Sequence, residues 1–502
     1  MKKIVIAIGL LYIISSGCKK DYLDINDNPN NPDNASPELV LPNALNVTAG
    51  RQINTYTFIS GWMGQWAISG SYAPSNSNFT TYRQTTDFGN AIWTNIYNNL
   101  EDYEYTRSTA HDQSKPFFEG AAMIMKSYEY QQLIDMFGNI PYTQSLQNVD
   151  AILPTYDDAS SVYEDLVKKI DTGISLIKVS GGQGASASSD IMFSGDVTSW
   201  VQFANTLKLR ILMRQSEVKA DYVKSAIAVI MQEGSGFLNV DANVNPGYQN
   251  ATGKQNPFWS LNYNTSNTYI NDFWRASQFG IDFYNTNDEN STTYDPRGRE
   301  VYGATPGDDT LWQGNDLGAQ GFVGGASSIF GPGVLQSVSQ PATILTAAES
   351  YFLQAEAVAR GWLSGDGTAQ DLYHQGITES FRYYNVDNYE SAAADYYNNT
   401  ANSKVYWGSG LSLTSELNLI VAQKWAAENT ATPFEEWCDY RRLPTLPFNK
   451  SIPLSKSTNV DELAVPLRIL YPTSEYASNS TNVKAQNQGS DAHHTDKIFW
   501  MP

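Results

Sequence analysis

The chain has 502 residues, which exceeds the usual size of a single domain and leaves ample sequence for a large core. Its formal net charge of -20 at pH 7 excludes nucleic acid and anionic lipid as expected partners, because binding to phosphate groups needs concentrated lysine and arginine. The 31 tyrosines and 12 tryptophans, set among many small polar residues, are typical of an extracytoplasmic protein with aromatic faces and polar loops.

The N-terminus predicts an export signal. Lys2 and Lys3 precede an apolar run at residues 4–14 that is too short to span a bilayer, and small residues follow the run. Cys18 comes directly after these small residues, as in a lipoprotein signal, so we expect residues 1–17 to be removed and Cys18 to be acylated. The alternative is an ordinary cleaved signal with an incidental cysteine. Acylation with chains such as palmitate would anchor the mature protein without spanning the membrane.

Residues 18–37 predict an extended tether, since they are rich in Asn, Asp and Pro and show no apolar period. Residues 38–502 are then expected to form a single domain with a loop-rich insertion at about residues 240–341. Apart from Cys18 the chain has only Cys438, so no intramolecular disulfide is expected once Cys18 is acylated. We expect Cys438 to be buried as a small apolar side chain.

Helical periodicity dominates the first half of the chain. Four stretches place apolar residues every three or four positions, on one face of a helix. The four faces consist of Ile92, Ile96, Leu100 and Tyr103; of Phe117, Ala121, Ile124 and Tyr128; of Val162, Leu166, Ile170, Ile174 and Ile177; and of Trp200, Phe203, Ala204, Leu207 and Ile211. Pro116 suits the first turn of the second helix, and Gly138 suits its end. Each stripe needs a neighbouring helix to cover it, so the pattern predicts packed helices.

Later segments predict helix pairs that pack closely. One face carries Tyr351, Ala355 and Ala359, and the next carries Leu372, Gly376, Ile377 and Phe381. Small residues between aromatic anchors permit close helix pairs, as in tetratricopeptide repeats, although no strict repeat period is present. Residues 417–427 and 434–441 predict a further pair. Residues 240–341 are rich in Asn, Gly, Tyr and Trp and show few periods, so we expect functional loops there.

Several charged residues on these helices are expected to be structural. Arg210, Arg214 and the pair Arg441-Arg442 should bond carboxylates or helix-end carbonyls. The four histidines leave little for a His-rich metal site, and the adjacent His493 and His494 near the C-terminus are expected to be solvated.

Two regions combine flat aromatic side chains with small polar ones. A sugar-binding surface needs this mix, because rings stack on the apolar faces of pyranoses while amides and carboxylates bond the hydroxyls. The first region contributes Trp62, Trp66, Tyr72 and Tyr82. The second contributes Trp259, Tyr263, Tyr269, Trp274 and Trp312, beside Asn262, Asn264 and Asn271. For each ring the alternative is burial in the core, where large aromatics are common.

Other interpretations stay open. The same aromatic regions could hold an extended peptide through main-chain hydrogen bonds. A secreted glycoside hydrolase would need two carboxylates, and adjacent pairs such as Glu435-Glu436 are weak candidates because catalytic partners are normally far apart in sequence. No cofactor is expected, although four neighbouring side chains could bind calcium without the spacing of a known calcium loop. These four are Asp288, Glu289, Asn290 and Asp295.

Six motifs, in order along the chain, carry a family resemblance: CKKDYLD at 18–24, MFGNIPY at 136–142, FANTLKLR at 203–210, ESYFLQAEA at 349–357, WCDYRR at 437–442 and PLRILYP at 466–472. Together they resemble the SusD/RagB family of nutrient-binding outer-membrane lipoproteins, and its SusD-like second branch in particular. The resemblance implies a mainly α fold with degenerate tetratricopeptide-like helix pairs and an irregular, loop-rich ligand-facing half.

The same resemblance implies a function. Members of this family are lipid-anchored at the cell surface, cover a SusC-like TonB-dependent outer-membrane barrel as a hinged lid, and capture oligosaccharides or peptides for import without doing chemistry. We therefore expect a binding protein for nutrient uptake, with an oligosaccharide as the first candidate ligand. Residues 240–341 match no family motif residue by residue, so the resemblance does not identify the ligand.

Overall fold

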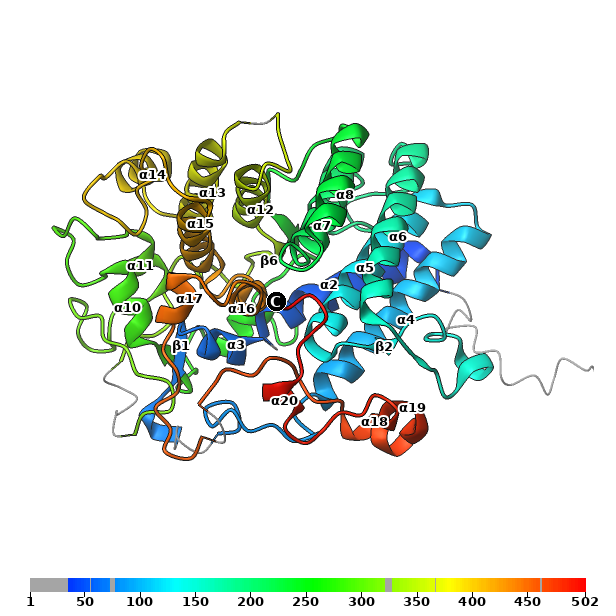
Figure 1. The fold of residues 1–502 in the computed structure, drawn as a ribbon, viewed down its shortest axis with the longest axis horizontal. Coiled ribbons are helices and arrows are strands. Elements are labelled where there is room, and N and C mark those ends of the chain that lie inside the picture. The colour runs from blue at the N-terminus through cyan, green and yellow to red at the C-terminus, as the bar shows by residue number, and fades with distance from the viewer. Residues whose placement is uncertain (1–34, 55, 73–76, 321–326, 366, 461–462) are drawn as a thin grey trace, which may run out of the picture.

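A computed structural model describes residues 35–54, 56–72, 77–320, 327–365, 367–460 and 463–502 (Figure 1). The predicted signal peptide at residues 1–17, the lipidation site Cys18 and nearly all of the tether at residues 18–37 lie outside these described residues. Within the described ranges, no helix is both long and apolar enough to cross a membrane.

The four helices predicted in the first half of the chain are confirmed. This half contains α2 (Pro37–Asn54), α4 (Asn90–Asp112), α5 (Pro116–Phe137), α6 (Ala159–Ser180), α7 (Val197–Met213) and α8 (Ala220–Glu233). Pro116 occupies the first turn of α5, and Gly138 follows its last residue with a φ of 80°. The Asp158 and Asp196 side chains cap α6 and α7. Figure 1 shows α4 to α8 standing side by side, each packed on the next.

The later helix pairs are also confirmed. They comprise α12 (Ala347–Ala359), α13 (Ala369–Tyr383), α14 (Tyr389–Tyr397), α15 (Leu413–Glu428) and α16 (Pro433–Arg442). Gly376 explains how closely α12 and α13 approach, since a Cβ at that position would lie 2.9 Å from the Phe352 ring. We call α4–α8 together with α12–α16 the helical scaffold.

Short elements joined by loops make up the segment between the two helical groups. They are β4 (Ala242–Val244), α9 (Pro257–Asn262), β5 (Trp274–Ala276), α10 (Gln278–Tyr284) and α11 (Arg297–Val301). The predicted loop-rich character of residues 240–341 is therefore seen in the structure, and we call this stretch the loop segment.

The described chain contains three two-stranded antiparallel sheets, two of which connect distant parts of it. β1 (Trp66–Ile68) pairs with β5, β2 (Ile140–Pro141) pairs with β3 (Tyr156–Asp157), and β4 pairs with β6 (Ala342–Leu345). The remaining short helices are α3 (Thr57–Trp62), η2 (Gly70–Tyr72), η4 (Asn148–Ala151), α17 (Pro447–Ser451), α18 (Thr473–Ser478), α19 (Ser480–Lys484) and α20 (Ala492–Thr495). The β1–β5 pair joins the loop segment to the N-terminal part of the chain.

Buried ion pairs tie the helical scaffold together, as predicted for its arginines. Arg210 on α7 makes two 2.7 Å hydrogen bonds to Glu349 on α12, and both side chains are essentially fully buried. Arg442 on α16 bonds Glu356 on α12 at 2.6 and 2.7 Å. Arg214 contacts carboxylates on α5 and α16 in the same way. Such pairs are costly to break, because the remaining charge would stay buried and unpaired.

Three residues near the C-terminus test smaller expectations. Arg441 bonds backbone carbonyls of Asp135 and Leu467 as expected. Cys438 is fully buried, and burial raises the pKa of its thiol to about 12, so it behaves as a small apolar side chain. His493 is only 2% exposed, which contradicts the expectation that it is solvated. The Leu467 N–H donates to the His493 backbone carbonyl at 2.6 Å, which joins this histidine to the 466–472 segment.

Candidate ligand-binding surface

The pairing of β1 with β5 brings the two predicted aromatic regions together. Ile68 lies opposite Trp274, and the Ser69 N–H donates to the Phe273 carbonyl at 2.8 Å. The chain after β1 therefore runs beside the chain before β5. The Tyr72 and Phe273 rings meet edge to face at 5.2 Å, and Tyr72 is 47% exposed. We define the aromatic surface as seven at least partly exposed rings, those of Tyr72, Phe79, Trp259, Tyr263, Tyr269, Phe273 and Trp274.

The other end of the aromatic surface is built on α9. The Asn256 side chain caps this helix by accepting from the Phe258 and Trp259 N–H groups at 2.9 and 3.0 Å. The four-residue spacing of a helix then stacks Trp259 on Tyr263, with ring centroids 4.5 Å apart and planes inclined by 20°. Tyr263 meets Tyr269 edge to face at 5.3 Å. The near-parallel rings of Trp259 and Tyr263 are partly exposed, and flat rings of this kind stack on sugar rings.

Asparagines shape the loop that carries these rings. The Asn271 side-chain oxygen accepts from the Phe273 and Trp274 N–H groups at 3.0 and 3.1 Å, and its amide donates to Asn262 at 2.8 Å. Asn264 accepts from two backbone N–H groups of the following turn. Asn262 is fully buried, so it is a loop-forming residue rather than the predicted partner of ligand hydroxyls. An exposed polar group beside the surface is the carboxylate of Asp272, which pairs with Arg275.

Three predicted site residues lie in the core instead. Trp62, Trp66 and Tyr82 are 0% exposed and offer no ring face to a ligand in this structure. The Trp66 indole donates to Thr430 at 2.8 Å and its ring lies 3.9 Å from that of Phe330. These rings are buried because large aromatic side chains pack against distant parts of the chain. Burial in the core was the alternative considered for each ring.

Trp312 belongs to a different aromatic group. Its indole donates to the Tyr302 carbonyl at 2.8 Å, and the Arg299 guanidinium covers one ring face at 4.4 Å. Arg299 in turn pairs with Glu289. Asp295 faces Arg297 in a fully buried ion pair. Glu289 and Asp295 therefore point at arginines rather than at a shared calcium position, and the described residues contain no cluster of three or more His, Cys, Asp or Glu side chains suited to a metal.

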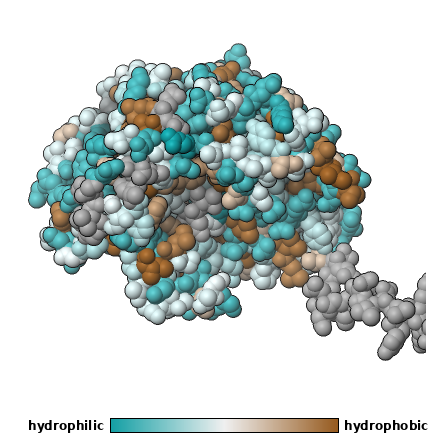
Figure 2. All heavy atoms as spheres, turned by 90° about the horizontal axis from the view of Figure 1, so that it is seen from below, coloured by the Kyte–Doolittle hydropathy of each residue, from teal (hydrophilic) through white to brown (hydrophobic). Residues whose placement is uncertain are grey.

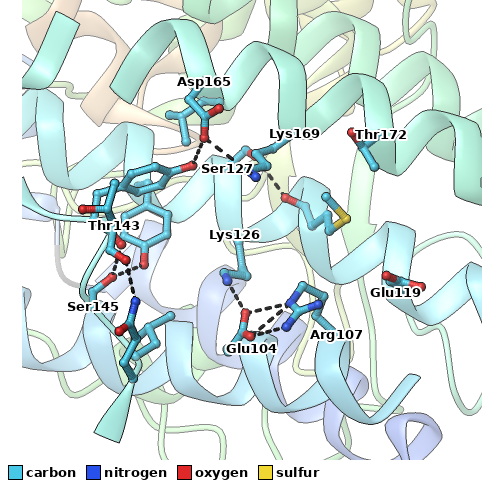
Figure 3. Close-up of a pocket in the computed structure, with 16 residues that line it drawn as sticks. Glu104, Arg107, Glu119, Lys126, Ser127, Thr143, Ser145, Asp165, Lys169 and Thr172 are labelled. Atoms are coloured by element: carbon cyan, nitrogen blue, oxygen red, sulfur yellow. Dashed lines mark hydrogen bonds and ion pairs between the residues drawn. The ribbon is translucent and has the colours of Figure 1, made fainter. Parts of the chain in front are cut away.

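A concavity of about 520 Å3 lies on the helical scaffold, between α4, α5, α6 and residues 142–147 (Figure 3). Its cations already face carboxylates: Lys126 and Arg107 both contact Glu104. Across the cavity the Tyr142 hydroxyl donates to Asp165 at 2.6 Å. Burial lowers the pKa of Lys126 in spite of its contact with Glu104. Sequence patterns did not predict this cavity, because its residues come together only through the packing of three helices.

A family model described as "Starch-binding associating with outer membrane" matches residues 29–472. No curated protein sequence matches the chain significantly.

Three solved structures are similar over nearly the whole chain. A chitin-binding SusD homologue from Flavobacterium johnsoniae has a TM-score of 0.73 and 23% identity, covering 92% of this chain and 98% of that one. A SusD homologue from Bacteroides uniformis has a TM-score of 0.71 and 25% identity, with 92% and 99% covered. A SusD-like protein from Bacteroides thetaiotaomicron has a TM-score of 0.70 and 22% identity, with 92% and 96% covered. The predicted fold class is thereby confirmed.

Proposed function

Because this chain belongs to the SusD-like family, whose model is described as starch-binding and associating with the outer membrane, we propose that it captures an oligosaccharide at the cell surface and delivers it to a SusC-like TonB-dependent barrel. The aromatic surface is the observation that carries this proposal. It gathers partly exposed rings on loops that a rigid helical scaffold supports, which is where binding residues are commonly found.

The contacts of the aromatic surface suit a sugar chain. The stacked pair Trp259 and Tyr263 and the exposed ring of Tyr72 offer flat apolar area. The side chain of Asp272 is 54% exposed, and Arg275 holds it in place, so its oxygens can accept hydrogen bonds from hydroxyls. Since one similar structure is a chitin-binding protein, chito-oligosaccharides are the first ligands to test, followed by malto-oligosaccharides.

Calorimetry on a soluble form that begins after Cys18 tests the proposal. We expect heat of binding with a glycan of this panel, and Trp259→Ala or Trp274→Ala should weaken binding by about tenfold each. Tyr406→Ala is the matched control, because Tyr406 is 37% exposed but lies outside the aromatic surface. Circular dichroism should show that each variant is folded. Binding of peptides alone would replace the oligosaccharide by the alternative ligand class, and unchanged affinity in both tryptophan variants would reject the aromatic surface as the site.

A hydrolase is the contrasting function, and the same panel distinguishes it. We expect the glycans to be recovered intact after prolonged incubation with the protein. Turnover that is lost on substitution of a single carboxylate, for example Glu435→Gln, would overturn the binding role.

The proposed location depends on the lipid anchor at Cys18. Labelling of cells with palmitate should mark the unaltered protein and not Cys18→Ala. Protease added to intact cells should degrade the anchored protein if it faces outward. A failure of labelling would leave the barrel as the proposed means of retention at the surface.

A further inference from the structure

The loop between β2 and β3 carries three large aliphatic side chains into solvent. Val149 is 82% exposed, Ile152 is 75% exposed and Leu153 is 58% exposed. Burial of such a side chain is stabilising, and the folded chain forgoes that stabilisation at each of these positions. An exposed apolar group of this kind marks an interaction surface when its neighbours are polar. We call these three residues the apolar tip.

Hydrogen bonds hold the base of the apolar tip in place. Asn482 on α19 donates to the Leu153 carbonyl at 3.0 Å, and Asn479 donates to the Pro154 carbonyl at 2.8 Å. A third hydrogen bond crosses the base of the loop, where the Thr155 N–H donates to the Gln144 side chain at 3.0 Å. The C-terminal helices therefore support a loop that lies more than 300 residues earlier in the chain. A surface that is ordered before it binds loses less entropy on association.

Backbone strain accompanies this arrangement. Leu146 has a φ of 60° and Asn148 has a φ of 50°, so both lie in the left-handed region. A bulky side chain such as that of Leu146 is rarely found there, because the conformation is strained. Strain of this kind persists where the surrounding contacts enforce it, commonly at functional sites. The turn at residues 146–148 directs the chain into η4 and the apolar tip.

An acidic cleft lies beside the apolar tip. It has a volume of about 490 Å3, and its lining includes Ile152, the aromatic side chain of Tyr97 and the carboxylates of Glu101 and Glu475. Asp150 lies within the tip itself and is exposed. No lysine or arginine occurs between Lys126 and Lys168. The apolar tip therefore has the carboxylates of Asp150, Glu101 and Glu475 in or beside it and no cation on its own loop.

This charge pattern favours a protein over a lipid as the occupant. Segments that insert into membrane interfaces usually carry Lys and Arg for the lipid headgroups, which this loop lacks. A complementary protein would present an apolar socket edged with basic side chains. Figure 2 shows hydrophobic atoms at several places on the face seen from below, and the right-hand end, which α4, α5 and α6 occupy in Figure 1, is one of them.

The start of the described chain lies on the same helix as the cleft. The Tyr105 hydroxyl on α4 donates to the Ala35 carbonyl at 3.0 Å, about one turn beyond Glu101 and two turns beyond Tyr97 on that helix. Residues 19–34 separate this point from the predicted lipidation site, and even a fully extended chain of that length spans at most about 58 Å. The tether therefore limits how far α4, which carries part of the cleft lining, can lie from the predicted lipid anchor.

We propose that the apolar tip and the acidic cleft form the docking surface for a membrane-embedded protein with an apolar socket and a basic rim. This inference rests on the proposed function, which supplies a transporter barrel as that protein. The aromatic surface, built on other elements, would remain open to ligand while the tip is bound.

Crosslinking in the outer membrane tests the docking surface. The chain is expressed together with its barrel, and a photoreactive benzoylphenylalanine replaces Ile152 or, as a control, Val179. Val179 is 81% exposed but lies at the far end of α6. We expect a covalent adduct with the barrel from position 152 and not from position 179, identified by mass spectrometry.

Co-purification provides the second measurement. The variant Val149→Ser/Ile152→Ser/Leu153→Ser should reduce recovery of the barrel by about tenfold or more. The matched variant Val179→Ser/Val229→Ser/Val240→Ser removes three exposed valines elsewhere and should have no effect. Thermal stability and glycan affinity should be unchanged in both, since all six side chains are exposed.

The outcomes separate this inference from the function on which it rests. Full recovery of the barrel with the tip variant would overturn the docking surface and leave capture and delivery intact. Failure of the unaltered protein to associate with the barrel would overturn the partner and delivery together, while calorimetry still reports on capture. If the soluble protein binds vesicles of phosphatidylethanolamine and phosphatidylglycerol and the tip variant does not, the tip is a membrane-binding element and the proposal is rejected.

Discussion

The helical scaffold and the loop segment are held together by different interactions. Buried pairs of full charges, such as Arg210 with Glu349, join the helices of the scaffold. In the loop segment, asparagine side chains such as that of Asn271 bond backbone groups and hold partly exposed aromatic rings. The family motifs fall mainly on the scaffold, whereas the candidate ligand contacts lie mainly on the loop segment. The difference indicates that stability and ligand specificity reside in separate sets of residues, and four predictions test that separation.

The largest effect is expected for Arg210→Ala. This change leaves Glu349, which is 0% exposed, without its partner, and breaking a buried pair costs about 3–5 kcal/mol. Urea unfolding of the soluble form should show the loss. Arg107→Ala is the control, because its pair with Glu104 is partly exposed and is worth about 0–1 kcal/mol. Equal losses in the two variants would contradict the contrast between buried and exposed pairs.

The next largest loss of stability is expected from a change at the contact between α12 and α13. In Gly376→Ala the new methyl group would lie 2.9 Å from the buried Phe352 ring, and such overpacking costs about 1–3 kcal/mol. Gly50→Ala in α2 is matched to it, since both glycines are inside helices but a Cβ at Gly50 meets Pro257 at an ordinary 3.6 Å. Unfolding midpoints should fall for Gly376→Ala and not for Gly50→Ala. Glycan affinity should change in neither, unless the scaffold and the aromatic surface are coupled.

Much of the scaffold could be predicted because its signals are local. The apolar stripes of α4 to α7 follow the helical period, and arginines between them were expected to find carboxylates. The exposed rings could not be distinguished from buried ones in the same way. Trp66 and Trp259 both have small polar residues near them in the sequence. Trp66 is nevertheless buried, and its indole bonds Thr430, which lies 364 residues later. Contacts over such separations leave no periodic signal, so ring exposure had to come from the structure.

The apolar tip could be predicted from the sequence only in part. Val149, Ile152 and Leu153 stand in a stretch without any cation, which is visible in the sequence. Their exposure depends on the hydrogen bonds from Asn479 and Asn482, and these bonds cannot be recognised in the sequence. The resemblance to a known family predicted the fold and a barrel partner, but neither the tip nor the cavity of Figure 3.

Two buried carboxyl groups of the scaffold should make its stability depend on pH. Burial raises the pKa values of Glu428 and Glu436 well above the usual 4.5, although Lys424 opposes the shift. These groups stay protonated in the folded state where the unfolded chain ionises them. Their contribution is therefore present in full below pH 4.5 and is lost as the pH rises toward the folded-state pKa, by up to about 1.4 kcal/mol per pH unit for each group.

Glu436→Gln removes one of these ionisations and provides the measurement. Urea unfolding between pH 5 and pH 9 should show a shallower fall in stability for this variant than for the unaltered protein. Glu379→Gln, a substitution of a more exposed carboxylate on α13, should leave the profile as it is. An identical slope in Glu436→Gln would mean that Glu436 is ionised in the folded protein.

The most local effect on stability and the sharpest effect on binding are expected for Asn271→Ala. The substitution removes the acceptor of the Phe273 and Trp274 N–H groups and the bond to Asn262, at a cost of about 1–3 kcal/mol that falls on one loop. Because this loop positions the rings of the aromatic surface, glycan affinity should fall by about tenfold or more. Asn287→Ala is the matched control, since the Asn287 side chain brackets Trp312 with two hydrogen bonds of 2.7 and 2.9 Å. If affinity falls only in Asn271→Ala, the ligand rests on the aromatic surface alone. If affinity falls in both variants, Trp312 also contacts the ligand, as the composition of the second aromatic region indicated. The binding site then extends along the loop segment to α11.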